Sequence, residues 1–345
     1  MGEHAAVYQR PALVAAVDRR LVVKISERER GGVRLELPQV AVRDEFSWDE
    51  IRRYGETCRR RWQSYSERPD PESFRRVRGE DPAHLVKVAL AEAAAYLGEQ
   101  EGPPLCLHLD SRIPIGSGFG SSAATAVAVV DAYLALRGVT LAPDELHRLS
   151  LEVERRQHGL PSGVDNATVL HGGIVWARTG ASGGVAATPI AARSRALERI
   201  QIFHSGTPAE PTGTVVAMVR SRKAAEPERY GALIDRIEAV TRELRRELET
   251  EGEAPDRLIG IIRTCEACLE ALGVVPPAVR ELIRGVEARG GAAKISGAGS
   301  LDGPGAGSLL VYHPEVGTIA GGELLDGRAP LDLCLGAEGV RRETI

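Results

Sequence analysis

The sequence lacks any apolar run long enough to cross a membrane, since none approaches the roughly eighteen residues that a spanning helix needs. Its start also lacks a basic segment followed by an apolar one, the pattern of a secretory leader. Positive charge is not in excess, because 44 Lys and Arg face 48 Asp and Glu for a net charge of −4. We therefore expect a cytoplasmic protein that binds neither nucleic acid nor membranes and holds any anionic ligand at a local site.

Cysteine and lysine are also scarce. Five cysteines, an odd number scattered along 345 residues, argue against a disulfide framework. Cys265 and Cys268 form a CxxC within an amphipathic pattern, but no second pair completes a zinc site, so we interpret both as structural thiols. Arginine carries nearly all the basic charge, since the only lysines are Lys24, Lys87, Lys223 and Lys294.

What is present fits a globular protein of two ordinary domains, with 43% hydrophobic and 27% charged residues. The pattern predicts an α+β fold. Residues 10–42 have the Val and Leu content of short strands, and residues 47–99 predict two helices joined by a polar surface loop at 66–73. Residues 104–114 predict a strand that leads into a glycine-rich loop.

The sequence after the glycine-rich loop also predicts a mixture of helices and strands. A long Ala- and Val-rich segment after the loop predicts a buried helix ending at Gly138, followed by a helix with a Pro-Asp start. The Gly-, Ala- and Ser-rich residues 179–189 mark a domain boundary or a hairpin. Later segments predict a strand at 172–178, a strand at 200–206, amphipathic helices over 228–285, a β-turn-β unit over 292–314 and an edge strand at 331–343.

The strongest local motif is the loop PIGSGFGSSA, in which glycines 116, 118 and 120 precede a helix start. Glycines there let backbone amides converge on one point, which is how phosphate is bound at a helix N-terminus. The loop is not a Walker A motif, because no lysine follows it. Ser121 and Ser122 fall at the helix start, where one hydroxyl can cap the helix and the other can bind Mg²⁺. The alternative is a glycine-rich turn with a serine N-cap and no ligand. The candidate ATP-binding residues are Pro114, Gly116, Ser117, Gly118, Gly120, Ser121, Ser122 and Ala123.

Two carboxylates follow at a fixed spacing. Glu154 falls in the last turns of a predicted helix, where the helix dipole disfavours it unless a metal, Arg155 or Arg156 compensates. Asp165 follows a Pro-Ser-Gly turn in a predicted loop, from which it could reach a substrate hydroxyl. A solvated Glu and a turn-capping Asp are the alternatives. Phosphoryl transfer needs charge neutralisation and a carboxylate that orients or deprotonates the attacking hydroxyl, so the motifs together favour a kinase.

A third glycine-rich run, residues 294–300, gives a second place where backbone can approach a ligand, although a flexible hairpin would look the same. The three motifs, in this order and along essentially the whole chain, resemble the GHMP kinases. The block HGLPSGVDNA resembles the mevalonate kinases of that family more than its galactokinases, and the opening GEHAAVYQRPAL is similar to theirs.

The resemblance implies a two-domain kinase that uses ATP and Mg²⁺ to phosphorylate mevalonate to 5-phosphomevalonate in isoprenoid synthesis, with ATP and acceptor meeting between the domains. It implies an N-terminal ribosomal-protein-like α/β domain at 1–180 and a ferredoxin-like domain at 181–345. It also implies that Ser122 and Glu154 hold Mg²⁺ and that Asp165 meets the C5 hydroxyl. The substrate-binding residues that it implies are Glu3, His4, His158, Ser162, Gly163, Gly297 and Ala298.

One feature departs from the family pattern. The family's lysine, which precedes the Gly-Glu-His in a Pro-Gly-Lys strand, would fall before Met1, and no other lysine is an obvious substitute. We expect an upstream segment to be missing and this chain to be a weak kinase, since a lysine near the transferring phosphate stabilises shifting negative charge. The alternatives are a kinase of another small alcohol such as phosphomevalonate or a sugar, with Arg112, Arg155 and Arg156 meeting an added phosphate, or a non-catalytic ATP-binding relative. A homodimer stays open.

Overall fold

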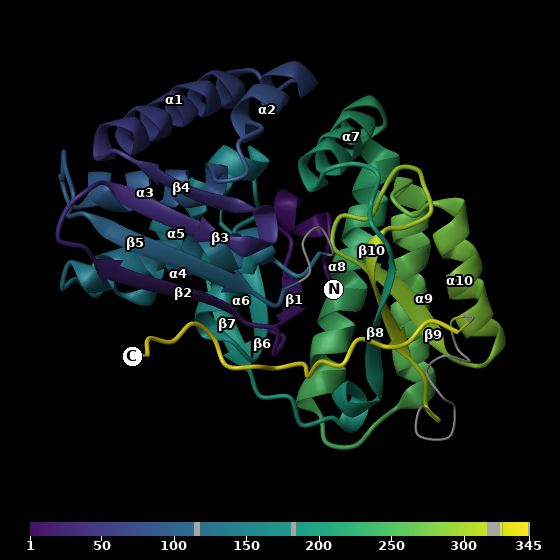
Figure 1. The fold of residues 1–345 in the computed structure, drawn as a ribbon. Helices are drawn as coiled ribbons and strands as arrows, with labels where there is room; N and C mark the ends of the chain where they lie inside the picture. The colour runs from purple at the N-terminus through teal and green to yellow at the C-terminus, as the bar shows by residue number, and fades with distance from the viewer. Residues whose placement is uncertain (114–117, 181–183, 316–324, 326, 344–345) are drawn as a thin grey trace. The chain divides into compact units, whose positions relative to one another are not determined.

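The computed structural model describes the chain except residues 114–117, 181–183, 316–324, 326 and 344–345 (Figure 1). The chain forms two compact units, each assembled from separate segments. Unit 1 consists of Met1–Asp18, Ile115–Phe119 and Gly172–Glu338, and unit 2 consists of Arg19–Pro114, Gly120–His171 and Gly339–Ile345. These units interleave along the chain. The division into two sequence-continuous domains, at residues 1–180 and 181–345, stays a prediction.

Unit 2 is built on a four-stranded sheet in the order β2–β5–β3–β4. Strands β3 and β5 are parallel, and the other neighbours are antiparallel. Burial alternates along β3 and β5, so one face of the sheet is turned to the core. The strands are β2 (Leu21–Glu27), β3 (Val33–Leu37), β4 (Val42–Phe46) and β5 (Leu105–Ser111), with a 3₁₀ turn η2 (Pro38–Val40) between β3 and β4.

Six helices complete unit 2. Helix α4 is apolar on all sides and is buried between α3, α5 and β2, which explains its Ala- and Val-rich sequence. A polar α1 begins at a capping box in which Ser47 and Glu50 satisfy each other's backbone amides. The helices are α1 (Trp48–Glu67), α2 (Pro71–Arg78), α3 (His84–Tyr96), α4 (Ser121–Leu136), α5 (Pro143–His158) and α6 (Val164–His171).

Unit 1 contains two three-stranded antiparallel sheets, in the orders β1–β6–β7 and β8–β10–β9. Helices α8 and α9 pack side by side, and α9 and α10 contact β9. The strands are β1 (Ala12–Ala15), β6 (Ile174–Thr179), β7 (Val185–Ile190), β8 (Ile200–Gly206), β9 (Ala292–Ser296) and β10 (Gly307–Tyr312). The helices are η1 (Ala5–Tyr8), η3 (Arg195–Arg199), α7 (Thr212–Ala225), α8 (Pro227–Glu249), α9 (Pro255–Leu272) and α10 (Pro277–Ala288).

Most predicted elements are confirmed, and three predictions are wrong. The polar stretch at 66–73 is only partly a loop, because Pro71 opens helix α2 and Asp70 caps it. Residues 331–343 form isolated bridges at Leu335 and Glu338 rather than an edge strand. Asp165 lies in the first turn of helix α6 rather than in a loop. Of residues 179–189, Thr179 and residues 185–189 belong to a hairpin, since β6 and β7 pair antiparallel.

The CxxC lies on α9, where Cys265 and Cys268 are buried thiols, as predicted. No helix among the described residues is long and apolar enough to cross a bilayer.

Helix α1 approaches α3 at Gly55, which is buried. A Cβ at Gly55 would overlap the Cβ of Ala91, so Gly55→Ala should force the two helices apart and lower the free energy of unfolding by about 1–3 kcal/mol. Gly260, an exposed mid-helix glycine on α9 with open space around it, is the matched control. Gly260→Ala should instead stabilise by about 0.5–1 kcal/mol through helix propensity. Chemical denaturation measures both, and a stabilised Gly55→Ala would contradict the close packing.

Candidate active site

The glycine-rich loop ends in an uncapped helix. Gly120 is the N-cap of α4 in a left-handed conformation with φ 66°, and no side chain caps the helix. The expected serine cap is therefore wrong, and the first amides of α4, at Ser121, Ser122 and Ala123, have no partner within the helix. An anion is the natural partner for such amides. The predicted binding residues Pro114, Gly116 and Ser117 lie outside the described residues.

Ser122 contacts two side chains of α5. Its hydroxyl donates to Glu154 Oε2 at 3.2 Å, and its Oγ lies 3.0 Å from His158 Nε2. Glu154 and His158 are four residues apart on one helix face, with 3.7 Å between Oε2 and Nε2. Three residues predicted from two separate motifs thus meet at the start of α4.

Glu154 is buried without a compensating cation. Its side chain is 3% exposed, and its Oε1 has no hydrogen-bond partner among the described residues. Burial, with the nearby charge of Asp165, raises the pKa of Glu154 to about 8, and the Ser122 hydroxyl offsets this only in part. Neither neighbouring arginine serves it, because Arg155 and Arg156 both bind Glu152, and Arg156 also reaches Glu92.

This donor set fits a magnesium ion. The unpartnered carboxylate oxygen of Glu154 and the hydroxyl of Ser122 are hard oxygen ligands, which Mg²⁺ prefers. The residues that the structure describes contain no group of three or more His, Cys, Asp or Glu side chains that could hold a metal. Mg²⁺ commonly takes only one or two protein ligands and completes its shell with water and phosphate oxygens, so a two-ligand site agrees with it.

Asp165 lies beside the same helix start. A Cβ placed on Gly120 would be 3.7 Å from the Asp165 Cβ, and Asp165 is exposed. Ser162 and Gly163 form the turn before it: Ser162 Oγ accepts from the Val164 amide, and His147 Nε2 lies 2.8 Å from the carbonyl oxygen of Gly163. The buried His147, which the sequence did not single out, therefore supports the turn that presents Asp165.

Unit 1 gathers the other predicted residues. His4 is 5% exposed, and its Nε2 lies 2.9 Å from the carbonyl oxygen of Ala298. Gly118 packs on the same strand end, since a Cβ there would approach the Ser296 carbonyl oxygen to 2.9 Å and Gly297 adjoins it. His4 adopts φ 57° and ψ −40°, a strained conformation for a residue with a side chain. Burial lowers the pKa of His4, which favours the neutral imidazole.

Lys294 is the functional candidate that the sequence did not assign. Its side chain is 1% exposed, and its Nζ donates to Glu3 Oε1 at 2.7 Å and to the carbonyl oxygen of Ile295 at 2.5 Å. Burial is the largest single influence and would raise the pKa of Glu3, but the charges of Lys294 and of the Met1 amino group, with the hydrogen bond from Lys294, together outweigh it and hold the pKa at about 2. The scarcity of lysine was the one signal in the sequence that could have drawn attention to this residue.

The chain is similar to known small-molecule kinases. Residues 84–173 match the GHMP kinases N terminal domain. A mevalonate kinase of Thermococcus sibiricus is 28% identical, with 100% of this chain and 95% of that relative covered. A crystal structure of mevalonate kinase has a TM-score of 0.73 at 19% identity, covering 98% of this chain and 96% of its own. A galactokinase of Lactococcus lactis complexed with galactose has a TM-score of 0.72 at 16% identity, covering 98% and 91%.

The chain belongs to the GHMP kinase family and has that family's α+β fold. It is a small-molecule kinase of this family, and its sequence is mevalonate-kinase-like at 28% identity.

The raised pKa of Glu154 gives stability a specific pH dependence. Between the unfolded value of 4.5 and about 8, the folded protein keeps a proton that the unfolded chain releases. The free energy of unfolding should therefore fall as pH rises through this window, by on the order of a few kcal/mol. Glu154→Gln removes this dependence, so its stability relative to the natural chain should grow between about pH 5.5 and about pH 8.

Urea unfolding at the two pH values measures this difference. Glu281→Gln, which changes an exposed carboxylate on α10, is the control and should leave the pH profile unchanged. Parallel profiles for Glu154→Gln and the natural chain would contradict a protonated, buried Glu154.

The Lys294–Glu3 pair predicts a double-mutant cycle. Lys294→Met removes the nearer of two cations from the buried Glu3 carboxylate, leaving the Met1 amino group at 3.7 Å, and should cost about 3 kcal/mol of unfolding free energy. Adding Glu3→Gln removes that charge and should restore most of the loss. Lys24→Met, at an exposed lysine on β2, is the matched control and should stay within about 0.5 kcal/mol of the natural chain. Additive losses in the double variant would show that the two side chains do not interact.

Proposed function

We propose that this protein transfers the γ-phosphate of ATP to the C5 hydroxyl of mevalonate, giving 5-phosphomevalonate and ADP. The observation that carries the proposal is the grouping of Ser122, Glu154 and Asp165 at the uncapped start of α4. The uncapped amides suit the phosphates, the oxygen pair suits Mg²⁺, and an exposed carboxylate is available to an alcohol.

Each residue has a chemical role in this proposal. The amides of Ser121, Ser122 and Ala123 bind phosphate oxygens, and Ser122 with Glu154 would hold the Mg²⁺ that neutralises phosphate charge. The C5 oxygen attacks the γ-phosphorus while the bond to the β–γ bridging oxygen breaks and ADP leaves. Asp165 orients the hydroxyl and accepts its proton.

The residues that we propose to bind the acceptor come from the start of the chain and from the third glycine-rich run. Glu3, His4, Gly297 and Ala298 are assigned to mevalonate by their likeness to the family motifs. Lys294 does not take the part of the family lysine in this scheme, because it is buried and bound to Glu3. It acts instead as a positioning residue that fixes the Glu3 carboxylate next to His4.

Mevalonate is favoured over an acceptor that already carries a phosphate. Such an acceptor needs cations, for which Arg112, Arg155 and Arg156 were the candidates. Arg156 is only 3% exposed and is bound to Glu92 and Glu152, and Arg155 also binds Glu152. Two of the three arginines are thus already neutralised, which argues against phosphomevalonate.

The test is ADP release with Mg·ATP and a panel of alcohols that includes mevalonate, phosphomevalonate and galactose. Mevalonate should give the highest kcat/KM. Faster turnover of another alcohol would keep the kinase and replace the substrate, whereas nucleotide binding without turnover of any acceptor would favour a non-catalytic ATP-binding protein.

In the same assay, Asp165→Asn should lower kcat by about 10²–10⁴-fold, because the carboxylate that accepts the proton is lost. ATP affinity should change less than about twofold, since Asp165 is not assigned to the phosphates. Asp144→Asn is the matched control, because Asp144 is an exposed aspartate in the first turn of the neighbouring helix α5. An unchanged kcat in Asp165→Asn would remove Asp165 from the catalytic role.

A further inference from the structure

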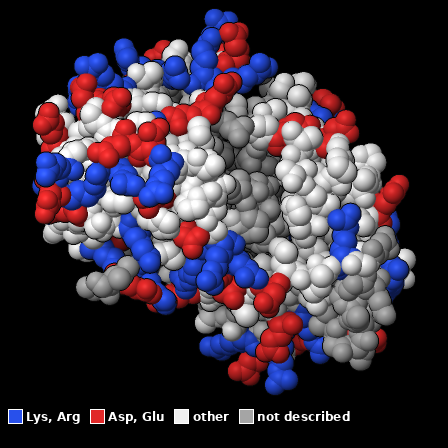
Figure 2. All heavy atoms as spheres, in the orientation of Figure 1, with Lys and Arg blue, Asp and Glu red and all other residues white. Residues whose placement is uncertain are grey.

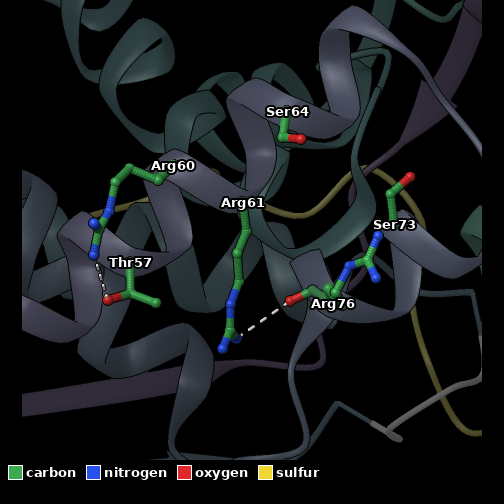
Figure 3. A pocket seen from close by; sticks show the side chains of 6 residues that line it. All are labelled: Thr57, Arg60, Arg61, Ser64, Ser73 and Arg76. Atoms are coloured by element: carbon green, nitrogen blue, oxygen red, sulfur yellow. Dashed lines mark hydrogen bonds between the residues drawn. The ribbon is translucent and has the colours of Figure 1, made fainter.

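A second anion-binding feature lies on unit 2, away from the start of α4 in sequence. Helices α1 and α2 pack together, and side chains from both line an open pocket of about 320 Å³ (Figure 3). Three arginines and three hydroxyl side chains line it: Thr57, Arg60, Arg61, Ser64, Ser73 and Arg76. We call it the α1–α2 pocket.

The pocket has positive charge available for a ligand. Arg60 and Arg61 are exposed and form no ion pair with any residue that the structure describes; Arg60 contacts only the Thr57 hydroxyl at 3.4 Å, and Arg61 donates to the Arg76 carbonyl oxygen at 3.4 Å. Arg76 pairs with Glu72, whose side chain is 79% exposed. An exposed pair of this kind is weak, so an anion can compete for Arg76.

Basic side chains surround the pocket, but they do not form a continuous basic surface. Figure 2 shows Lys and Arg side chains gathered at the upper edge of the view, where α1 and α2 lie in Figure 1, with acidic side chains among them. A nucleic acid or membrane would need a broad basic surface, whereas the net charge here is −4. The volume is at the small end of ligand pockets, which span roughly 300–1,000 Å³. It therefore suits one or two phosphate groups.

Arginine next to hydroxyl groups is the usual protein chemistry for such groups. The guanidinium plane donates two parallel hydrogen bonds to phosphate oxygens, and the Ser64 hydroxyl can add a further donor, whereas the Thr57 and Ser73 hydroxyls already donate their protons within the protein. Thr57 and Ser73 are held in place by their own bonds, to the Arg53 carbonyl oxygen and to Asp70. The polar wall of the pocket is thus partly ordered before a ligand arrives.

The opposite side of the helix pair holds a segment of the candidate active site. Trp62 Nε1 donates to the Gly159 carbonyl oxygen at 2.7 Å, and Tyr65 packs with Phe74 and against Leu160 through a small apolar cluster. This segment directly follows His158. A ligand that draws α1 and α2 together therefore acts on the backbone between His158 and Asp165.

We propose that the α1–α2 pocket binds the phosphate or diphosphate group of an anionic small molecule, and that its occupancy restrains residues 159–163. The pocket shares no residue with the proposed ATP site. Binding at the pocket does not require the proposed kinase activity, so the two proposals can fail separately.

The test is calorimetric titration of the full chain with pyrophosphate, first alone and then in the presence of Mg²⁺ and a non-hydrolysable ATP analogue that fills the proposed nucleotide site. One equivalent should bind, and the affinity should fall as salt is added. The double variant Arg60→Gln/Arg61→Gln should weaken binding by about tenfold or more. Arg53→Gln, at an exposed arginine of α1 that pairs with Asp49 outside the pocket, should bind within about twofold of the natural chain.

Three results would overturn the proposal: no saturable binding up to about 10 mM, equal affinity in the double variant, or loss of binding when the ATP analogue is added. Both arginines are exposed, so the double variant should keep the thermal midpoint of the natural chain, which a melting curve verifies. Hydrogen exchange tests the restraint: pyrophosphate should slow amide exchange over residues 159–163, and unchanged exchange in the bound protein would refute that part of the proposal.

Discussion

A buried carboxylate without a cation is the interaction on which unit 2 depends. Glu154 is buried on helix α5, and among the described residues the Ser122 hydroxyl and the His158 imidazole contact its carboxylate. Two nearby arginines could have neutralised it, yet both bind Glu152. The fold therefore bears a desolvation cost that a bound cation would remove, and unfavourable burial of this kind is characteristic of functional sites.

The packing of unit 2 holds the Glu154 carboxylate next to the N-terminus of helix α4. Helix α4 is mostly apolar, so its packing against α3, α5 and strand β2 fixes the position of its axis. Its first residue follows a glycine rather than a capping side chain, which leaves the amides for a ligand. A serine at position 120 would strain the left-handed backbone and satisfy an amide that the proposed function needs.

Sequence reasoning succeeded where the information is local. The alternating Val and Leu of β3 and the Ala and Val content of α4 fix which side of each element is buried, and both elements form as predicted. The start of α2 was missed because its prolines and acidic residues look like a loop, although Asp70 followed by Pro71 is also a helix start. The predicted strand at 331–343 had the right residue types but forms only isolated bridges to Val17 and Gly172.

The part of the site that could not be predicted is the part built from distant residues. Lys294 and Glu3 are 291 positions apart, and the sequence of neither segment indicates that the two side chains form an ion pair. Their pairing follows from the tertiary packing of unit 1, in which η1 and β9 belong to one compact body. The motif residues of the glycine loop and of α5 were found because nucleotide chemistry limits which residue types can serve, a constraint that does not apply to a supporting ion pair.

The distribution of arginine separates two kinds of anion site in unit 2. Near Glu154, Arg155 and Arg156 form ion pairs with Glu152 and Glu92. In the proposed function, phosphate is therefore bound there by backbone amides and a metal ion rather than by arginine. On α1, the adjacent Arg60 and Arg61 have no such acidic partners among the described ion pairs. Because Arg155 and Arg156 stack on Trp62 of the same helix, the two regions share one structural support, and a change in the position of α1 bears on both.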